Sequence, residues 1–134
     1  MDRSFSSHSS IWLYIYHFTS SIKKPLGLIR LKLGHSKYKR AEVWFKIHKA
    51  FWNQGFASEA SCAILAFSFD TLKLHRIEAG CAVDNIGSVK VLKKAGFIRE
   101  GTGRKVLPLK SGWSDNFEYV ILESDTRPQP KEQV

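Results

Sequence analysis

The sequence contains few cysteines and no recognisable metal-ligand pattern. Only two cysteines occur among 134 residues, Cys62 and Cys81, and both lie in apolar segments without CxxC spacing. They are therefore expected to be small core residues in a reducing compartment, and not a disulfide or redox pair. The five histidines are not spaced as metal ligands either, so no metal is predicted.

Long hydrophobic runs are missing as well. The apolar stretch at residues 11–18 contains Trp, Tyr and His, and it is too short to span a membrane. No small-residue cleavage site follows it, so it does not resemble a signal peptide. These features predict a cytoplasmic protein that does not associate with membranes.

Acidic residues are scarce relative to basic ones. The chain has 12 Asp and Glu against 21 Lys and Arg, which gives a formal charge of +9. Between residues 23 and 49, nine basic residues accompany a single acid, Glu42. A positive field of this kind favours anionic partners such as a phosphorylated cofactor, a nucleic acid or a ribosomal surface. Charge alone does not choose among them.

The length and the hydrophobic fraction of 43% predict one folded domain. Residue patterns predict strands at 11–18, 26–33, 41–48, 75–83, 97–109 and 113–122, and helices at 54–72 and from Asp84 or Asn85 to Gly96. This order predicts an α/β domain with a mixed sheet flanked by helices. The first helix is apolar nearly all round, so it is expected to be buried on most sides. Residues 1–10 are expected to be disordered, 11–123 to form the domain and 124–134 to be a flexible tail.

A glycine turn precedes the first predicted helix, within Phe51-Trp52-Asn53-Gln54-Gly55-Phe56-Ala57-Ser58. The start of a helix leaves backbone N–H groups without intrahelical partners, and the helix dipole adds positive charge there. A phosphate-bearing cofactor is therefore predicted at this junction. The second helix begins in the same way, at Asn85-Ile86-Gly87-Ser88. The alternative is that both are plain strand-to-helix turns.

Several motifs in order resemble the GNAT superfamily of acetyl-coenzyme A-dependent N-acetyltransferases. They are Ala41-Glu42-Val43-Trp44-Phe45-Lys46-Ile47-His48, the glycine turn, Leu74-His75-Arg76-Ile77-Glu78-Ala79, Asn85-Ile86-Gly87-Ser88 and Gly96-Phe97-Ile98-Arg99-Glu100-Gly101. The closest likeness is to the branch that contains the ribosomal-protein-alanine acetyltransferases. The resemblance covers about residues 24 to 123 and implies the acyl-CoA N-acyltransferase fold, mostly antiparallel.

The resemblance implies a binding site for acetyl-coenzyme A and no metal. The coenzyme pyrophosphate would bind the backbone amides of Gln54, Gly55, Phe56, Ala57 and Ser58. Its pantetheine arm would pair with Lys46, Ile47 and His48 like an added strand, with a backbone N–H there holding the oxyanion. Asn85 and Ser88 would lie beside the thiol. For Asn85 a helix-capping role is an equal alternative, and both roles are compatible.

The resemblance also suggests catalytic and substrate residues. Many family members place a tyrosine at the position of Leu92 to protonate the leaving thiolate, which leaves Ser88 as the candidate acid. Glu42 is the candidate base, acting through a water, and the alternative is a surface ion pair. Trp113 and Asp115 are candidates for the acceptor site, or else serve packing and turn formation.

Family members usually begin with a strand and two helices that form one wall of the acceptor pocket, and this sequence lacks them. Three explanations are compatible with the sequence: a truncated product or misassigned start, a homodimer partner that supplies the wall, and a coenzyme-binding remnant. The expected function is direct acetyl transfer in a ternary complex to a primary amine. The acceptor could be a protein N-terminal α-amine, a polyamine or another small amine. The alternative is a weakly active coenzyme-binding module that binds RNA or a ribosome through its basic surface.

Overall fold

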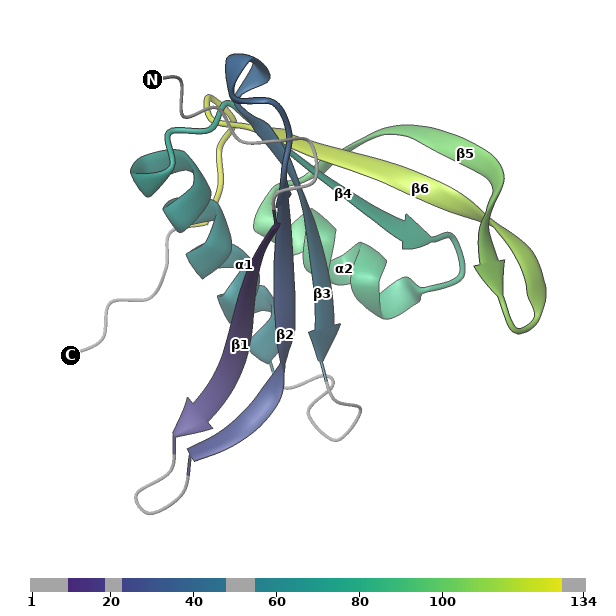
Figure 1. Cartoon of the computed structure of the whole chain (residues 1–134). Coiled ribbons are helices and arrows are strands. Elements are labelled where there is room, and N and C mark those ends of the chain that lie inside the picture. Colours follow the sequence, from purple (N-terminus) through teal and green to yellow (C-terminus); the bar gives the residue numbers. More distant parts are fainter. Residues whose placement is uncertain (1–9, 19–22, 48–54, 129–134) are drawn as a thin grey trace.

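The computed structural model describes residues 10–18, 23–47 and 55–128. Within them, no helix is both long and apolar enough to cross a membrane. The elements, shown in Figure 1, are β1 (Ser10–Phe18), β2 (Lys23–Leu33), the 3-10 turn η1 (Ser36–Tyr38), β3 (Arg40–Ile47), α1 (Phe56–Ala66), the π-helical turn η3 (Phe67–Thr71), β4 (Arg76–Ala82), α2 (Ile86–Ala95), β5 (Ile98–Leu109) and β6 (Gly112–Leu122).

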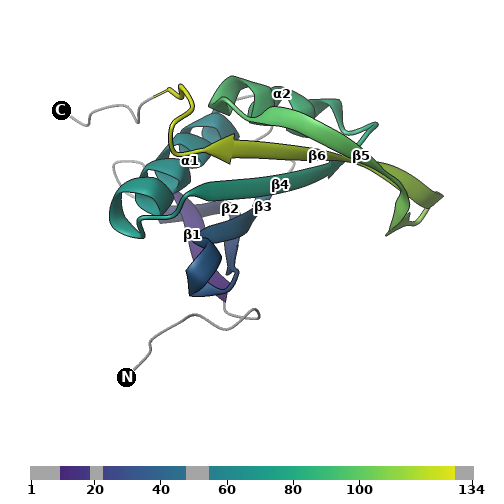
Figure 2. The ribbon, with the colours of Figure 1, turned by 90° about the horizontal axis from the view of Figure 1, so that it is seen from above.

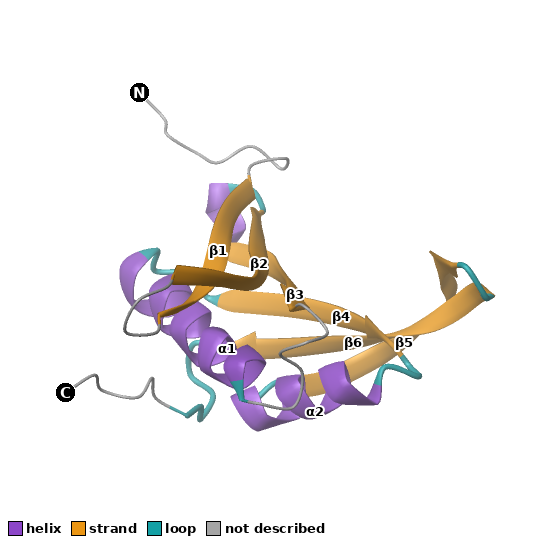
Figure 3. Ribbon diagram, turned by 90° about the horizontal axis from the view of Figure 1, so that it is seen from below, coloured by secondary structure: helices purple, strands orange, loops and turns teal. Residues whose placement is uncertain are grey.

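The strands form one six-stranded sheet in the order β1-β2-β3-β4-β6-β5. Only the β3–β4 pair is parallel, and the other neighbours are antiparallel. The predicted mixed, mostly antiparallel sheet is therefore confirmed. Both helices lie on the same face of this sheet (Figures 2 and 3). The opposite face, called here the outer face, has no helix over it among the described residues.

Alternation along β3 determines which side chains each face receives. Ala41 and Val43 are buried beneath the helices, whereas Glu42, Trp44 and Lys46 are exposed on the outer face. Because side chains alternate along a strand, the pattern in the sequence fixes this division. The same alternation in β4 buries Ile77, Ala79 and Cys81, and the prediction that Cys81 is a core residue is confirmed.

The core lies between the inner face of the sheet and the two helices. It is a single cluster of apolar side chains from the central strands, both helices and the residues that join them. Burial of this kind is the main favourable term in folding. Its members include Ile29, Leu31, Leu33, Val43, Ile64, Leu65, Phe69, Ile77, Leu92, Phe97, Tyr119 and Ile121.

The first helix is less enclosed than its composition suggested. Its buried residues are Ser61, Ile64 and Leu65, while Ala63 and Glu59 are exposed. The other residues of the helix are half-buried, so the expectation of burial on most sides is met only in part. Ser61 can be fully buried because its hydroxyl donates to the Ala57 carbonyl at 2.7 Å.

The chain stays in contact with the domain after β6, past the expected boundary at residue 123. The Arg127 guanidinium lies 4.9 Å from the centre of the Phe69 ring and pairs with Asp70 at 3.5 Å. Asp125 accepts a hydrogen bond from the Leu122 backbone N–H at 2.9 Å. Residues as far as Arg127 therefore cover the end of the first helical segment.

Candidate functional site

The two central strands separate partway along the sheet. β3 pairs with β4 only from Arg40 to Glu42, opposite Arg76 to Glu78. β3 continues to Ile47 and β4 to Ala82, and Figure 1 shows them fanning apart. Along residues 43–47, β3 therefore has no partner strand on its β4 side within the described part of the chain. Backbone groups on that side are available to pair with an extended ligand.

The first helix begins beside the end of β3 (Figure 1). Gly55 is its N-cap with φ 83°, a left-handed conformation that glycine adopts readily. The Gly55 carbonyl accepts from the Glu59 N–H at 3.0 Å. Gly55 has no side chain to cap the first turn, so within the described residues the amides of Ala57 and Ser58 have neither a side-chain cap nor an intrahelical acceptor. A helix start of this kind is suited to an anion.

The second helix begins four residues after β4 ends. Its N-cap is Asn85, whose side-chain oxygen accepts the Ser88 backbone N–H at 3.1 Å. The capping role proposed for Asn85 is therefore confirmed. Ser88 is half-buried in the first turn. Leu92 is 4% exposed and belongs to the core.

Some of the predicted coenzyme residues lie outside the described residues. These are His48 and Gln54, in the connection between β3 and α1. Ile47 is the last residue of β3, where it pairs with Gly27, and Lys46 is exposed opposite Leu28. Gly55, Phe56, Ala57 and Ser58 are all in the first turn of α1 or at its cap. The described part of the predicted site thus consists of the end of β3 and the starts of two helices.

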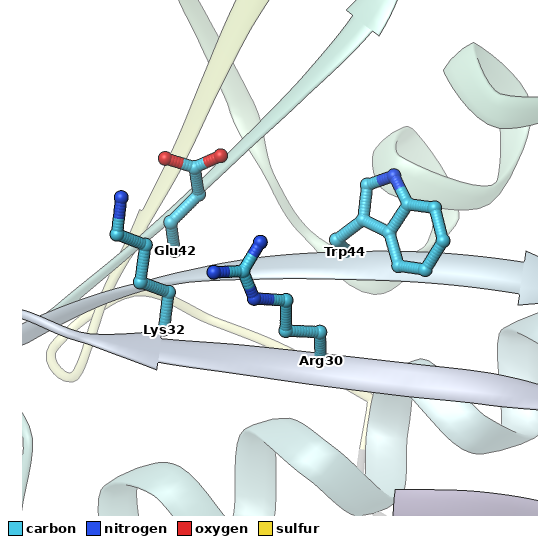
Figure 4. Close-up of a pocket in the computed structure, with 4 residues that line it drawn as sticks. All are labelled: Arg30, Lys32, Glu42 and Trp44. Atoms are coloured by element: carbon cyan, nitrogen blue, oxygen red, sulfur yellow. The ribbon is translucent and has the colours of Figure 1, made fainter. Parts of the chain in front are cut away.

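A hollow of about 130 Å³ lies on the outer face of the sheet, and it is lined by Arg30, Lys32, Glu42 and Trp44. The register of β2 and β3 places Lys32 opposite Glu42 and Arg30 opposite Trp44. In Figure 4 the charged ends of the first three residues gather over the strands, and the Trp44 indole lies farther along β3. We call this hollow the outer hollow. It begins at Glu42, where β3 leaves β4.

Glu42 borders a second hollow of about 120 Å³, whose other charged lining residues are Lys32, Arg40 and Glu78. Among the described residues no ion pair involves Glu42. The ion-pair alternative for this carboxylate is therefore not supported, and the carboxylate remains accessible to a water or an amine.

The sequence alone did not single out Arg30, Lys32 or Trp44. Their alternation is visible in the sequence, but the β2–β3 register that joins them to Glu42 is not.

The two predicted acceptor residues of the closing hairpin differ in their surroundings. Trp113 is 63% exposed near the turn. The Asp115 carboxylate accepts the Lys105 backbone N–H at 2.9 Å, and Lys105 has φ 49°. Asp115 thus holds an irregular stretch of β5, where the register shifts between Gly103 and Leu107. The hairpin extends away from the helices (Figure 2).

An ion-pair network lies on the outer face beyond Glu42. The Arg76 guanidinium donates to Glu100 at 2.7 and 3.1 Å and to Glu78 at 3.4 Å. The hydrogen bond from Arg76 lowers the pKa of Glu100 below its ordinary value, and that same bond raises the pKa of Arg76. Glu78 is therefore occupied by Arg76, unlike its register neighbour Glu42.

Comparisons with known proteins agree with this geometry. A family model described as the acetyltransferase (GNAT) domain matches residues 4–98. The chain is 36% identical over 114 residues to the probable N-acetyltransferase YjcK of Bacillus subtilis, covering 82% of this chain and 63% of that protein. It is 42% identical over 84 residues to the uncharacterised N-acetyltransferase YnaD of the same organism, covering 63% of this chain and 49% of that protein.

A solved structure gives the same result for the fold. A mutant of the spermidine N-acetyltransferase SpeG from Vibrio cholerae superposes with a TM-score of 0.77 at 25% identity, covering 86% of this chain and 66% of that one. The chain thus spans between about half and two thirds of the length of these relatives.

Proposed function

Because the chain belongs to the GNAT acetyltransferase family, we propose that it transfers an acetyl group from acetyl-coenzyme A to a primary amine. The single observation that carries the proposal is the separation of β3 from β4 beside the glycine-capped start of α1. Backbone groups along residues 43–47 would pair with the pantetheine arm, as proposed for Lys46, Ile47 and His48. The amides that follow Gly55 would bind the pyrophosphate, together with that of Gln54.

The reaction is direct transfer within a ternary complex. The amine nitrogen attacks the thioester carbonyl carbon, and a backbone N–H at the end of β3 stabilises the oxyanion that forms. Glu42, through a water, accepts the proton that the amine loses. The C–S bond then breaks, and the departing thiolate takes a proton from the Ser88 hydroxyl, directly or through a water, while water returns a proton to Ser88. Asn85 accepts the Ser88 backbone N–H and so holds the turn that carries this hydroxyl.

The acceptor is an amine, and its class is a separate question. The sequence resemblance suggests a protein N-terminal α-amine, while the name of the structural neighbour SpeG points to spermidine. A neutral nucleophile is required, and an α-amine with a pKa of about 7.7–8.0 loses its proton far more readily than lysine. Trp113 and Asp115 would approach the acceptor from the closing hairpin.

Calorimetric titration with acetyl-coenzyme A, followed by a screen of amine acceptors on the same sample, tests the proposal. We expect binding that weakens at least about tenfold in Gly55→Ala, because a methyl group would project toward the phosphates. Gly112→Ala is the matched control. Both glycines have positive φ and open space around an added Cβ, but Gly112 lies in the hairpin turn. Absence of coenzyme binding to the parent protein would refute the proposed function.

The role of Ser88 has its own test. We expect Ser88→Ala to lower kcat, because the coenzyme A thiolate would leave without this proton donor. The affinity for acetyl-coenzyme A should stay within about twofold of that of the parent. Unchanged turnover with intact coenzyme binding would exclude Ser88 as the acid.

A further inference from the structure

We propose that the turn around η1 binds a single-stranded nucleic acid, with a base stacked on Tyr38 and phosphates held by the lysines near it. This site lies apart from the proposed coenzyme site and does not depend on acetyl transfer. We call it the η1 patch, and its exposed members are Lys37, Tyr38, Lys39, Arg40 and Lys73. It combines an exposed aromatic ring with lysines that hold unfavourable backbone conformations.

Tyr38 is the centre of the η1 patch. The Arg40 guanidinium lies 5.3 Å from the centre of its ring, and the His35 ring lies 6.1 Å away, edge to face. These contacts orient the ring and still leave Tyr38 58% exposed. Proteins that bind single strands stack bases on such rings among basic side chains, and arginine adds a cation–π contribution.

Hydrogen bonds hold the backbone of this turn. The His35 imidazole accepts the Lys37 backbone N–H at 3.1 Å. The Lys39 carbonyl accepts two N–H groups where β4 begins, that of His75 at 2.6 Å and that of Arg76 at 3.3 Å. A turn held in this way has little backbone entropy left to lose when a ligand binds.

The three described non-glycine residues with a positive φ are all lysines. They are Lys39 at 48°, Lys73 at 56° and Lys105 at 49°. Glycine and asparagine adopt this left-handed conformation more readily than lysine does. The requirements of the turns therefore do not explain lysine at these positions, and two of the three belong to the η1 patch. A retained strained residue of this kind points to a role for its side chain.

Lys73 reaches the η1 patch from another element. It follows Leu72, which is the C-cap of η3. Two residues later, His75 donates its backbone N–H to the Lys39 carbonyl, so the two lysines lie at the same end of the sheet. In Figure 1 the dark-blue η1 turn and the start of β4 meet at that end.

Positive charge is in excess at this end of the sheet. Residues 34–41 contain three basic residues and no acid, and Lys73 adds a fourth cation. Two acids adjoin them: Glu42, two residues after Arg40, and Glu123, whose backbone N–H donates to the His75 carbonyl at 3.0 Å. The surplus attracts phosphates. The ring among the cations favours a nucleic acid, which carries a flat base for every phosphate, over an acidic protein.

The η1 patch and the proposed coenzyme site lie at opposite ends of β3. This strand begins at Arg40 and ends at Ile47, eight residues later counting both, so it is roughly 23 Å long at about 3.3 Å per residue. The first helix begins beside its far end (Figure 1). A single strand bound at the η1 patch would therefore leave the coenzyme site open.

The first test measures fluorescence anisotropy of a labelled oligouridylate of about 12 nucleotides with the intact protein at about 50 mM salt. Tyr38→Ala should weaken binding at least about fivefold, because a stacked base loses its ring. Tyr38→Phe keeps the ring and should bind within about twofold of the parent. Parent-like binding by Tyr38→Ala, or no binding by the parent, would overturn the inference.

A matched pair of lysine substitutions tests the charge. Lys39→Asn removes a cation from the η1 patch and leaves a residue that tolerates the left-handed conformation, so the urea midpoint should not fall. Its binding should be at least about threefold weaker, with a log–log salt slope less negative by about 0.7. Lys105→Asn removes the same charge at the same kind of φ, but from the β5–β6 hairpin, and should change neither. Equal weakening in both variants would overturn the inference in favour of the overall charge of the chain.

Further ligands identify the class of partner. Oligodeoxythymidylate that binds with the same dependence on Tyr38 and Lys39 would support the inference, since it offers the same bases and phosphates in a single strand. Tighter binding of a duplex would overturn it. So would binding to vesicles of phosphatidylserine and phosphatidylcholine in equal parts without binding to either single strand.

Titration with acetyl-coenzyme A separates this inference from the proposed function. The variants at Tyr38 and Lys39 should bind the coenzyme within about twofold of the parent, because they lie at the other end of β3. A coenzyme affinity that falls together with the oligouridylate affinity would mean that these variants disturb the whole fold, and would overturn the inference. A parent that binds oligouridylate through Tyr38 but does not bind coenzyme would refute the proposed function and support this one.

Discussion

Glu42 occupies a position in the sheet that no other acidic residue shares among those described. It ends the parallel pairing of β3 with β4, it lines both hollows, and it forms no ion pair there. Its register neighbour Glu78 lies on the same face but contacts the Arg76 guanidinium at 3.4 Å. The two carboxylates thus differ in their availability to accept a proton.

That difference predicts unequal effects of two isosteric substitutions. Glu42→Gln should lower kcat/KM by about 10²–10⁴-fold and remove the rise of rate with pH that reports the base. Glu78→Gln should change kcat/KM by less than about threefold, because Glu78 is engaged with Arg76. The measurement is a pH–rate profile for the parent and both variants. A Glu42→Gln profile that matches the parent would exclude Glu42 as the base.

At the scale of elements, each end of α2 is set by one particular residue. Asn85 caps the helix, and Gly96 ends it with φ 103°. A Cβ at Gly96 would lie 2.9 Å from the Thr126 carbonyl oxygen, so the C-terminal segment also requires glycine there. The helix is therefore held at both ends by its own sequence.

Substitution of Asn85 separates its two proposed roles. Asn85→Ala should lower the free energy of unfolding by about 1 kcal/mol, the usual effect of losing an N-cap. Asn85→Asp keeps an acceptor oxygen and should retain stability, while its negative charge beside the thiol should weaken coenzyme binding. Urea unfolding and calorimetric titration of both variants measure the two effects. If Asn85→Asp bound acetyl-coenzyme A as well as the parent, Asn85 would be a cap only.

Arg76 and Glu100 join two strands that do not pair directly. Arg76 belongs to β4 and Glu100 to β5, with β6 between them. Because hydrogen bonding to Arg76 lowers the pKa of Glu100, the folded state binds a proton less readily than the unfolded state. The stabilising contribution is thus complete above the ordinary pKa of Glu100 and is lost as the pH falls through its lowered value.

Glu100→Gln should therefore lower the urea midpoint at pH 7 and leave it unchanged relative to the parent at pH 2. The shift should be small, since the Glu100 side chain is 53% exposed and solvent screens the pair. Glu123→Gln provides the control, because Glu123 is exposed and forms no ion pair among the described residues. A Glu100→Gln effect of equal size at both pH values would mean that the charge is not responsible.

The sequence allowed local features of these elements to be predicted far better than their contacts. The cap at Asn85, the terminator at Gly96 and the alternation in β3 depend on neighbouring residues, so they could be predicted. The partner of Asp115 could not be predicted, because it is the Lys105 amide on the opposite strand of an irregular hairpin. The outer hollow likewise depends on the register across β2 and β3, which the turn between them sets.

At the scale of the whole molecule, the excess of positive charge allows two kinds of anionic partner. The formal charge of +9 would attract RNA as well as a coenzyme. The described basic side chains, however, are spread over β2, β3, η1, β4, α2 and the β5–β6 hairpin. The coenzyme would instead meet a fixed set of backbone amides at one helix start. These two modes of binding should respond differently to salt.

Polyuridylate binding should weaken steeply between about 50 and 200 mM salt, with a slope of about −0.7 per phosphate contacted. Acetyl-coenzyme A binding should weaken by less than about tenfold over the same range, because directed hydrogen bonds and apolar contacts remain when salt screens the long-range field. Calorimetric titrations with each ligand at several salt concentrations make the comparison. If polyuridylate stayed bound at 200 mM salt while acetyl-coenzyme A did not bind, the basic surface would be the functional one, and the chain would act as an RNA-binding module.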